Sequence, residues 1–359
     1  MIYLDHAASS PLRPEVLEAM RPWLGAPGNP ASVHRAGQRA RAALERARDD
    51  VAALIGGAPS GVVFTSGATE ANHLFLAGIV AKTGRSGLAF AAIEHPCIAA
   101  AARAAHGTVH ALAVGPDGCV VEQPLPEGLA AVCLMAANHE TGVLQPVTWA
   151  RAASAAVGAA LHVDAAHAAG RIDLDLGDVD AVTLSAHKLG GPVGIGALVL
   201  RDRGPFPALF DGPQERGRRG GTTNVAGAVG FAEAARLARV ELRQRSVVHR
   251  AWTDALATAV VACGGRVVGG ERVASTLCVV FPSIPGEAVV QALDVEGICV
   301  SSGAACASGA VEASPVLRAM GDPEPAGGVR FSLGWSTTAA EIDAVCAALP
   351  SLVARFQLG

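Results

Sequence analysis

Two short, mostly apolar runs that end in polar residues constrain the fold of this chain most strongly. The first run covers residues 159–163 and leads directly into Asp164. The second covers residues 181–184 and is followed closely by Lys188. Runs of this length and composition are typical of strands buried on both faces of a parallel sheet. Ligands of such sheets bind beyond the carboxyl ends of the strands, so the acid and the lysine are predicted to share one edge.

An acid and a lysine at neighbouring strand ends are the pair that an enzyme using pyridoxal phosphate (PLP) requires. The lysine forms a Schiff base with the cofactor, and the carboxylate keeps the pyridine nitrogen protonated so that the ring can accept electrons. Taken singly, Asp164 and Lys188 would be ordinary solvated residues, so the prediction depends on both reaching the same edge. Ser185 and His187 lie beside the lysine, where they are placed to add contacts to the phosphate of the cofactor.

Strand-like and helix-like segments alternate from about residue 15 to about residue 245, which predicts an α/β fold with a mostly parallel sheet. A long helix candidate at residues 232–261 then leads into a different mixture of strands and helices. The sequence therefore predicts a large α/β domain over residues 15–245. A smaller α+β domain is predicted to combine residues 1–14 with residues 246–359 and to carry a cysteine-containing loop.

Composition excludes several classes of function. The net charge of −4 gives no general attraction to nucleic acid or to anionic membranes. The apolar runs end well short of the roughly 20 residues that a bilayer span requires, and the first residues do not resemble a signal peptide. The eight cysteines show neither a C-x-x-C motif nor zinc-site spacing. We therefore expect a cytoplasmic protein with reduced thiols, no metal site, and no nucleic-acid or membrane partner.

A phosphate-binding turn is predicted at residues 65–70, which lie between a strand and a helix. Gly67 allows a tight turn, and the start of the following helix, at Ala68 and Thr69, offers N–H groups and the positive end of the helix dipole. An ordinary helix cap is the alternative interpretation. Beside an acid and lysine pair, phosphate binding is the better one, and the chain has no P-loop or dinucleotide motif that would indicate another ligand.

Two further polar residues stand out against apolar surroundings. His95 follows a predicted strand at residues 88–93, and its pKa range suits proton transfer, although a structural hydrogen bond is the more common role. Arg330 is flanked by strand-forming residues and needs an anionic partner. Its guanidinium matches a carboxylate, so substrate binding and a structural salt bridge are equally open. The loop at residues 218–224 is either solvent-exposed or reaches a phosphate across a subunit boundary.

The segment at residues 301–309 is small, polar and rich in glycine, which predicts a surface loop. It contains Cys306, and an exposed cysteine that forms a thiolate is a nucleophile. An incidental cysteine in an Ala/Ser/Gly loop is the alternative interpretation.

Taken together, these segments resemble the cysteine desulfurases of the NifS/IscS type, a branch of the fold-type I PLP enzymes. The resemblance covers essentially the whole chain and implies a large domain with a sheet of the seven-stranded type and a homodimer that converts L-cysteine to alanine. The matching segments are residues 2–8 (IYLDHAA), 28–34 (GNPASVH), 64–70 (FTSGATE), 94–95 (EH), 138–142 (NHETG), both strand ends, the cysteine loop and 330–334 (RFSLG).

The resemblance also implies a role for each matching residue. Lys188 carries the cofactor, Asp164 pairs with its pyridine nitrogen and His95 stacks on its ring. Cys306 takes the sulfur as a persulfide, which a sulfur-acceptor or iron–sulfur scaffold protein would receive. The remaining implied contacts are to the phosphate (Ala68, Thr69, Ser185, His187 and, from the other subunit, Thr222), to the ring or its phenolic oxygen (His139, His167) and to the substrate carboxylate (Asn29, Arg330).

Two positions depart from the family pattern. The family usually has asparagine where this chain has His139, and glutamine where it has His167. Histidine keeps the ability to donate a hydrogen bond, but it can carry a charge that an amide cannot. The hypothesis that follows is a working site with a shifted pH optimum.

Three other functions share parts of this pattern. A selenocysteine lyase has the same site but does not depend on the loop cysteine, so it would keep full turnover of selenocysteine without Cys306. A related aminotransferase needs no such cysteine and requires a keto-acid acceptor. A non-enzymatic binding scaffold predicts damage to the catalytic set, whereas Lys188, Asp164 and His95 are all present.

Overall fold

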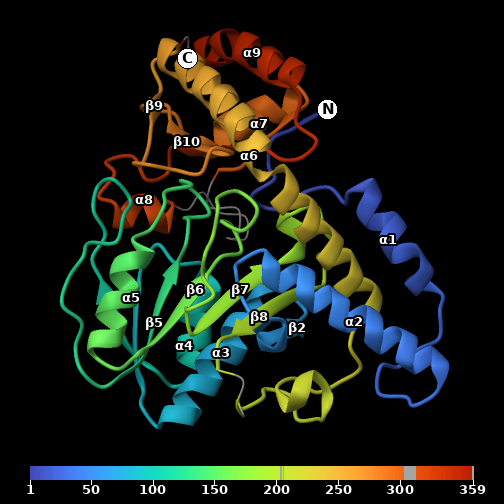
Figure 1. The fold of residues 1–359 in the computed structure, drawn as a ribbon. Helices are drawn as coiled ribbons and strands as arrows, with labels where there is room; N and C mark the ends of the chain where they lie inside the picture. The colour runs from blue at the N-terminus through green and yellow to red at the C-terminus, as the bar shows by residue number, and fades with distance from the viewer. Residues whose placement is uncertain (203, 205, 303–312, 358–359) are drawn as a thin grey trace.

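The computed structural model describes residues 1–202, 204, 206–302 and 313–357. In this part of the chain a seven-stranded sheet forms the centre of the molecule, and a three-stranded sheet lies at one end of it (Figure 1). None of the described helices combines the length and the apolar character needed to cross a membrane.

The large sheet has the strand order β2-β8-β7-β6-β5-β3-β4. Strand β8 is antiparallel to both of its neighbours, and all other pairings are parallel, which confirms the predicted mostly parallel sheet. The strands are β2 (Val62–Thr65), β3 (Gly87–Ala91), β4 (Thr108–Leu112), β5 (Leu129–Met135), β6 (Ala160–Asp164), β7 (Ala181–Ser185) and β8 (Gly196–Leu200).

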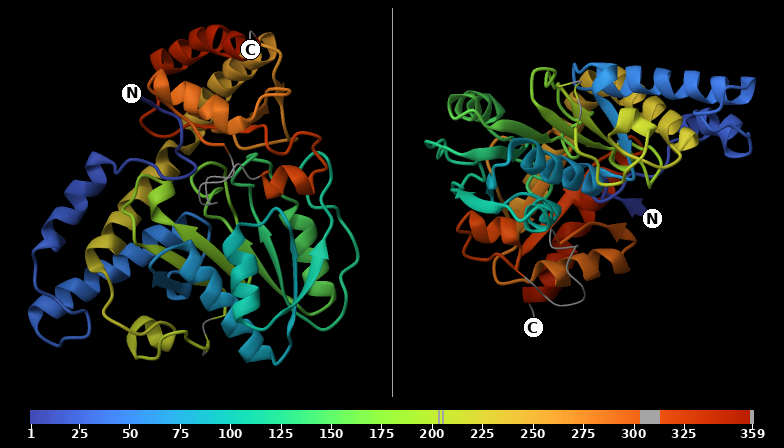
Figure 2. Two further views of the ribbon diagram at one scale, coloured as in Figure 1. Left: turned by 180° about the vertical axis from the view of Figure 1, so that it is seen from behind. Right: turned by 90° about the horizontal axis from the view of Figure 1, so that it is seen from below.

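Helices cover both faces of this sheet, which is why its strands are apolar throughout. Alternate residues of β5 show the two sides: Val132 and Leu134 belong to one core, and Ala131 and Cys133 belong to the other. The second core is closed by α3 (Ala68–Thr83) and α4 (Pro96–Ala104). The first is closed by α1 (Pro14–Leu24), α2 (Arg35–Ala53), α5 (Val147–Ala156) and the first half of α6 (Val225–Ala262), as Figures 1 and 2 show.

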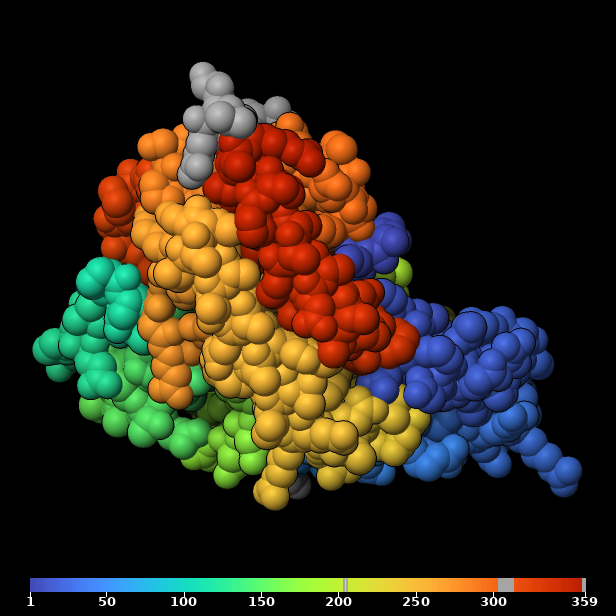
Figure 3. Space-filling model, turned by 90° about the horizontal axis from the view of Figure 1, so that it is seen from above, coloured from blue at the N-terminus to red at the C-terminus, as the bar shows by residue number. Residues whose placement is uncertain are grey.

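Helix α6 continues beyond the large sheet and joins the second group of elements. Its last turns contribute Leu256 and Val260 to a third core, and it lies beside α9 on the molecular surface (Figure 3). The predicted boundary at residue 245 falls inside this helix, so the division into two domains stays a prediction. The other elements of this part are β9 (Arg266–Val267), β10 (Thr276–Val280), α7 (Gly286–Val295), β11 (Ile298–Cys299), α8 (Pro315–Ala319), β12 (Gly328–Ser332) and α9 (Ala339–Gln357).

The N-terminal segment contacts both the three-stranded sheet and the edge of the seven-stranded sheet. Strand β1 (Ile2–Tyr3) pairs in parallel with β11, and Asp5 forms an isolated bridge to Ser332 at the end of β12. A few residues later, the Ser10 N–H donates to the carbonyl of His187, 2.8 Å away at the edge of the large sheet. The N-terminal segment therefore runs from the second group of elements to the strand end that carries the predicted lysine.

A buried ion pair anchors the loop that follows β8. The carboxylate of Glu215, in the short 3-10 helix η3 (Gln214–Gly217), accepts hydrogen bonds from both terminal nitrogens of Arg48, at 2.7 and 2.8 Å. The backbone N–H of Phe64 in β2 donates to the same carboxylate at 2.9 Å. A buried ion pair persists when further hydrogen bonds satisfy its atoms. This one fixes the loop containing Thr222 against β2, the strand that leads into the predicted phosphate-binding turn.

Candidate active site

A cavity of about 550 Å³ opens at the carboxyl ends of β6 and β7. This is the edge of the sheet at which the sequence pattern predicted a cofactor site. Most of the predicted site residues, contributed by segments far apart in the chain, line this one cavity: Ala68, Thr69, His95, His139, Asp164, His167, Ser185, His187, Lys188 and Arg330.

Asp164 is the last residue of β6, and two donors fix its carboxylate. The side-chain amide of Asn72 donates to Oδ2 at 2.9 Å, and the N–H of Ala166 donates to Oδ1 at 2.9 Å. Asn72 comes from α3 and is fully buried, and its amide also contacts the sulfur of Cys97 at 3.1 Å. The sequence analysis missed Asn72. Its signal is a polar residue among the otherwise apolar buried positions of a helix.

Lys188 ends the short 3-10 helix η2 (Ala186–Lys188), which follows β7 directly. Its backbone carbonyl accepts hydrogen bonds from Ser10 Oγ at 3.3 Å and from Arg171 Nη2 at 3.2 Å. Residues from the N-terminal segment and from the loop after β6 thus fix the backbone that delivers the lysine to the cavity.

His95 is the N-cap residue of α4, and its Nδ1 accepts a hydrogen bond from the N–H of Cys97 at 3.2 Å. Since Nδ1 is the acceptor, the proton of the neutral ring lies on Nε2. Burial lowers the pKa of His95, the charge of Lys188 lowers it further, and Asp164 opposes the shift. The ring packs edge-on against His139, with 5.3 Å between the ring centroids.

Two histidines stand where the resemblance would give amides: His167 is buried, and the side chain of His139 is 14% exposed. Burial lowers the pKa of His139 and of His167 well below the usual value, and the nearby cations Lys188 and Arg330 add to the effect. Nε2 of His167 lies 3.2 Å from Thr276 Oγ1. Nδ1 of each ring is buried without a hydrogen-bond partner among the described residues. The lowered pKa favours the neutral form of both rings, which suits them to hydrogen bonding, and the shifted pH optimum stays a prediction.

Arg330 lies in β12 and is held from two sides. Its Nη2 donates to Asp5 Oδ1 at 2.6 Å, and its Nη1 donates to the carbonyl of His139 at 2.7 Å. Its Nε is buried and has no partner among the described residues. Asp5 is a second residue that the sequence analysis missed, because only the fold brings the N-terminal segment to β12.

The turn before α3 fits a phosphate group. Ser66 N–H donates to Glu70 Oε2 at 2.7 Å, so the turn is braced by its own side chain, while the first N–H groups of a helix have no partner within it. Gly196 allows β8 to lie close against this turn, since a Cβ at this position would be only 2.7 Å from Gly67 Cα. Ser185 Oγ is buried in the same cavity without a partner among the described residues. These donors match the acceptor oxygens of a phosphate.

Three predicted site residues lie elsewhere. Asn29 is exposed in the loop before α2, where its Oδ1 accepts from the N–H of Ala31 at 2.9 Å. Thr222 lines a neighbouring cavity that shares Ser66 with the main one. Cys306 lies outside the described residues. In the part of the chain that the structure describes, no cluster of three or more histidine, cysteine or acidic residues is arranged to hold a metal ion.

The buried and half-buried histidines predict how stability depends on pH. Their folded-state pKa lies below the unfolded value of about 6.5, so the stability that they contribute is present above pH 6.5 and is lost as pH falls below it. Burial raises the pKa of Glu94 to about 8, that of Glu140 to about 7, and also that of Asp50. These carboxyl groups change the stability in the opposite direction, but they are fewer than the histidines. The histidines with a lowered pKa are His6, His95, His139, His162, His167, His187 and His249.

We expect the free energy of unfolding to fall as pH is lowered from 6.5 to 5, and we expect His162→Leu to reduce this slope. Burial lowers the pKa of His162 to about 4, so the variant removes up to about 1.4 kcal/mol per pH unit. Urea denaturation at several pH values measures the slope. Thr183→Val is the matched control, because it removes the hydroxyl 2.9 Å from His162 Nε2 and leaves the histidine in place. An unchanged slope in His162→Leu would contradict the assignment.

Comparison with known proteins identifies close relatives along the whole chain. Residues 2–345 match the family described as aminotransferase class-V. A cysteine desulfurase of Cereibacter sphaeroides is 42% identical, over 98% of this chain and 95% of the relative. A solved structure described as a NifS-like protein has a TM-score of 0.91 at 30% identity and covers 98% of this chain and 99% of its own. A structure described as SspA in complex with cysteine has a TM-score of 0.81 at 27% identity, covering 94% of this chain and 100% of its own.

Proposed function

The chain belongs to the aminotransferase class-V family, and within it to the PLP-dependent cysteine desulfurases, and from this premise we propose that it passes the sulfur of L-cysteine to Cys306. The observation that carries the proposal is the single cavity shared by Asp164, Lys188 and Arg330. PLP, when bound, supplies an electron sink that weakens bonds at the carbons of an attached amino acid. The residues around it hold the reactants and move protons.

The roles proposed for the cofactor-binding residues follow from their contacts. Lys188 holds PLP covalently, and its backbone is fixed by Ser10 and Arg171. Asp164, oriented by Asn72, pairs with the pyridine nitrogen. The phosphate lies at the start of α3, with Ala68, Thr69, Ser185 and His187 around it and with Thr222 of a second subunit completing the contact.

The remaining polar residues face the substrate and the ring. Arg330 binds the carboxylate of L-cysteine. Asp5 and the His139 carbonyl orient its guanidinium, and its Nε has no partner among the described residues. His95 stacks on the ring and moves a proton through Nε2. His139 and His167 donate hydrogen bonds toward the ring as neutral imidazoles. Asn29, exposed in this chain, is proposed to contact the substrate carboxylate from its loop.

Cys306 completes the reaction by accepting the sulfur. Its thiolate forms a sulfur–sulfur bond with the substrate sulfur, the bond between that sulfur and the β-carbon breaks, and the β-carbon gains a proton. The products are alanine and a persulfide on Cys306, so no external oxidant is required. We further propose a cytoplasmic homodimer whose persulfide goes to a sulfur-acceptor protein, such as an iron–sulfur scaffold.

The proposal is tested by measuring alanine and sulfide from L-cysteine in the presence of a reductant. The native enzyme is expected to release both in equal amounts, and Cys306→Ala is expected to release neither above background, while binding PLP normally. Cys346→Ala, which removes a cysteine on α9, is the matched control and should keep full activity. A Cys306→Ala variant that turned over selenocysteine at the native rate would instead indicate a selenocysteine lyase.

A further inference from the structure

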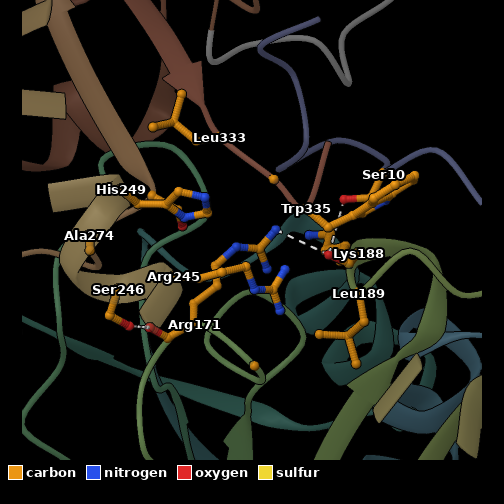
Figure 4. Close-up of a pocket in the computed structure, with 13 residues that line it drawn as sticks. Ser10, Arg171, Lys188, Leu189, Arg245, Ser246, His249, Ala274, Leu333 and Trp335 are labelled. Carbon is orange, nitrogen blue, oxygen red and sulfur yellow. Dashed lines mark hydrogen bonds between the residues drawn. The ribbon is translucent and has the colours of Figure 1, made fainter. Parts of the chain in front are cut away.

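A second cavity, of about 30 Å³, also borders Lys188 and lies where α6 meets the loop after β6 and the segments before β10 and after β12 (Figure 4). A space of this size holds one or two water molecules or one monatomic ion. The polar residues that line it are Ser10, Arg171, Lys188, Arg245, Ser246, His249 and Ser275. No carboxylate is among the described residues that line it.

Arg171 brings a charge that no described acid pairs with. Within the described part of the chain its guanidinium donates only to backbone carbonyls, at 2.8 Å to His167, 3.1 Å to His6 and 3.2 Å to Lys188. Carbonyl dipoles orient a cation, but they do not cancel its charge. Burial and the nearby charge of Arg245 lower the pKa of Arg171 to about 9, which leaves the guanidinium charged at neutral pH.

Arg245 shares its only described acid with another arginine. Its Nε lies 3.3 Å from Glu241 Oε2, but the two oxygens of Glu241 already accept hydrogen bonds from Arg13 at 2.9 and 2.6 Å. Glu241 is therefore shared by two guanidinium groups, and among the described residues the only other acid near them is the exposed Glu15, 3.7 Å from Arg13 Nε. Figure 4 shows the Arg171 and Arg245 side chains meeting between His249 and Trp335. The local charge is positive, and buried charges in proteins are normally paired.

A hydroxyl group supplies the independent observation. Ser275 is only 3% exposed, it lines this cavity, and its Oγ has no hydrogen-bond partner among the described residues. A buried hydroxyl without a hydrogen-bond partner lowers the stability of the fold. The group that accepts a hydrogen bond from Ser275 here must also fit beside two cations. The neighbouring His249 does not compete as a cation, because burial, Arg245 and Arg171 lower its pKa to about 4.

We propose that this cavity binds one halide ion, chloride under cellular conditions, between the guanidinium groups of Arg171 and Arg245 with Ser275 Oγ–H as a further donor. The ion balances the excess positive charge and links α6 to the segments that precede β10 and follow β6. Because Arg171 also holds the carbonyl of Lys188, the ion stabilises the backbone that positions the lysine.

Crystals of the holoenzyme grown with bromide give the direct test, since bromide produces an anomalous difference peak. We expect a peak between Arg171 and Arg245 that is lost in Ser275→Ala or strongly reduced. In solution, chloride is expected to raise the melting temperature by about 2 °C relative to gluconate at equal ionic strength. Ser246→Ala is the matched control, because Ser246 Oγ lines the cavity but already donates to the Arg171 carbonyl at 3.4 Å.

The variants also separate the ion from a simple loss of stability. The melting temperature of Ser275→Ala should equal that of the native holoenzyme in gluconate and be lower than it in chloride. Ser246→Ala should keep the full rise in melting temperature that chloride causes. Arg245→Gln should abolish the response. A site without a bromide peak, together with equal melting temperatures in the two salts, would overturn the proposal and leave the cavity to water.

Discussion

Lys188→Ala is expected to lower kcat/KM for L-cysteine by about 10⁴-fold or more. In the proposed mechanism the variant loses the covalent attachment of the cofactor and the proton transfers at Nζ, and general acid–base catalysis alone contributes up to about 10⁴-fold. Lys188 lines the main cavity, and its backbone carbonyl is held by Ser10 and Arg171. The measurement is alanine formation under single-turnover and steady-state conditions.

The chain offers an unusually clear control for this prediction, because it contains only two lysines, Lys82 and Lys188. Lys82 lies on α3 away from the cavity, where its Nζ pairs with Asp202 Oδ2 at 2.6 Å. Lys82→Ala should keep native activity. Borohydride reduction followed by peptide mass analysis should place the cofactor on Lys188 and leave Lys82 unmodified. Cofactor attachment to Lys82, or residual turnover of Lys188→Ala near the native rate, would refute the assignment.

The second large effect is expected for Asp164→Asn, which should lower kcat by about 10²–10⁴-fold. In the proposed site the carboxylate pairs with the protonated pyridine nitrogen of PLP. Breaking a buried charge pair costs about 3–5 kcal/mol, and each 1.36 kcal/mol in the barrier is a factor of ten in rate. The variant keeps the size of the side chain and the hydrogen-bonding ability of Oδ1 toward Ala166, but it removes the negative charge. We would measure kcat and the affinity for PLP in the native enzyme and in the variant. A loss of kcat with little loss of affinity shows that the charge acts on catalysis rather than on cofactor binding.

Asp180→Asn is the matched control for this experiment. Leu161 lies in β6, at the opposite end from Asp164, and its N–H donates a hydrogen bond to the Asp180 carboxylate at 2.9 Å. Asp180 lies outside the main cavity. Its replacement should leave kcat unchanged. Equal losses in Asp164→Asn and Asp180→Asn would show that the effect is structural. An Asn72→Ala variant should give a smaller loss than Asp164→Asn, since it removes one of the two donors that orient the carboxylate.

Local sequence patterns were sufficient for the architecture around the site. The apolar runs before Asp164 and Lys188 are strands β6 and β7, with the parallel pairing that the pattern predicted. The reason is that strands buried on both faces need continuous apolar residues, which leave a readable signature. The predicted helix at residues 232–261 is also present, but α6 begins earlier, at Val225 after an N-cap by Asn224. Its first turns are rich in small residues and show little periodicity.

The sequence by itself determined which chemistry could be predicted for the site, because an acid, a lysine and a turn suited to phosphate must be encoded as residues at strand and helix ends. Only the tertiary structure decided how those residues are held and charged. Asn72 meets Asp164, and Asp5 meets Arg330, through contacts between distant segments that no local pattern records. Likewise, the sequence alone could not predict whether His139 and His167 are charged or neutral. Their burial in the fold lowers the pKa of both, since desolvation disfavours the charged imidazole.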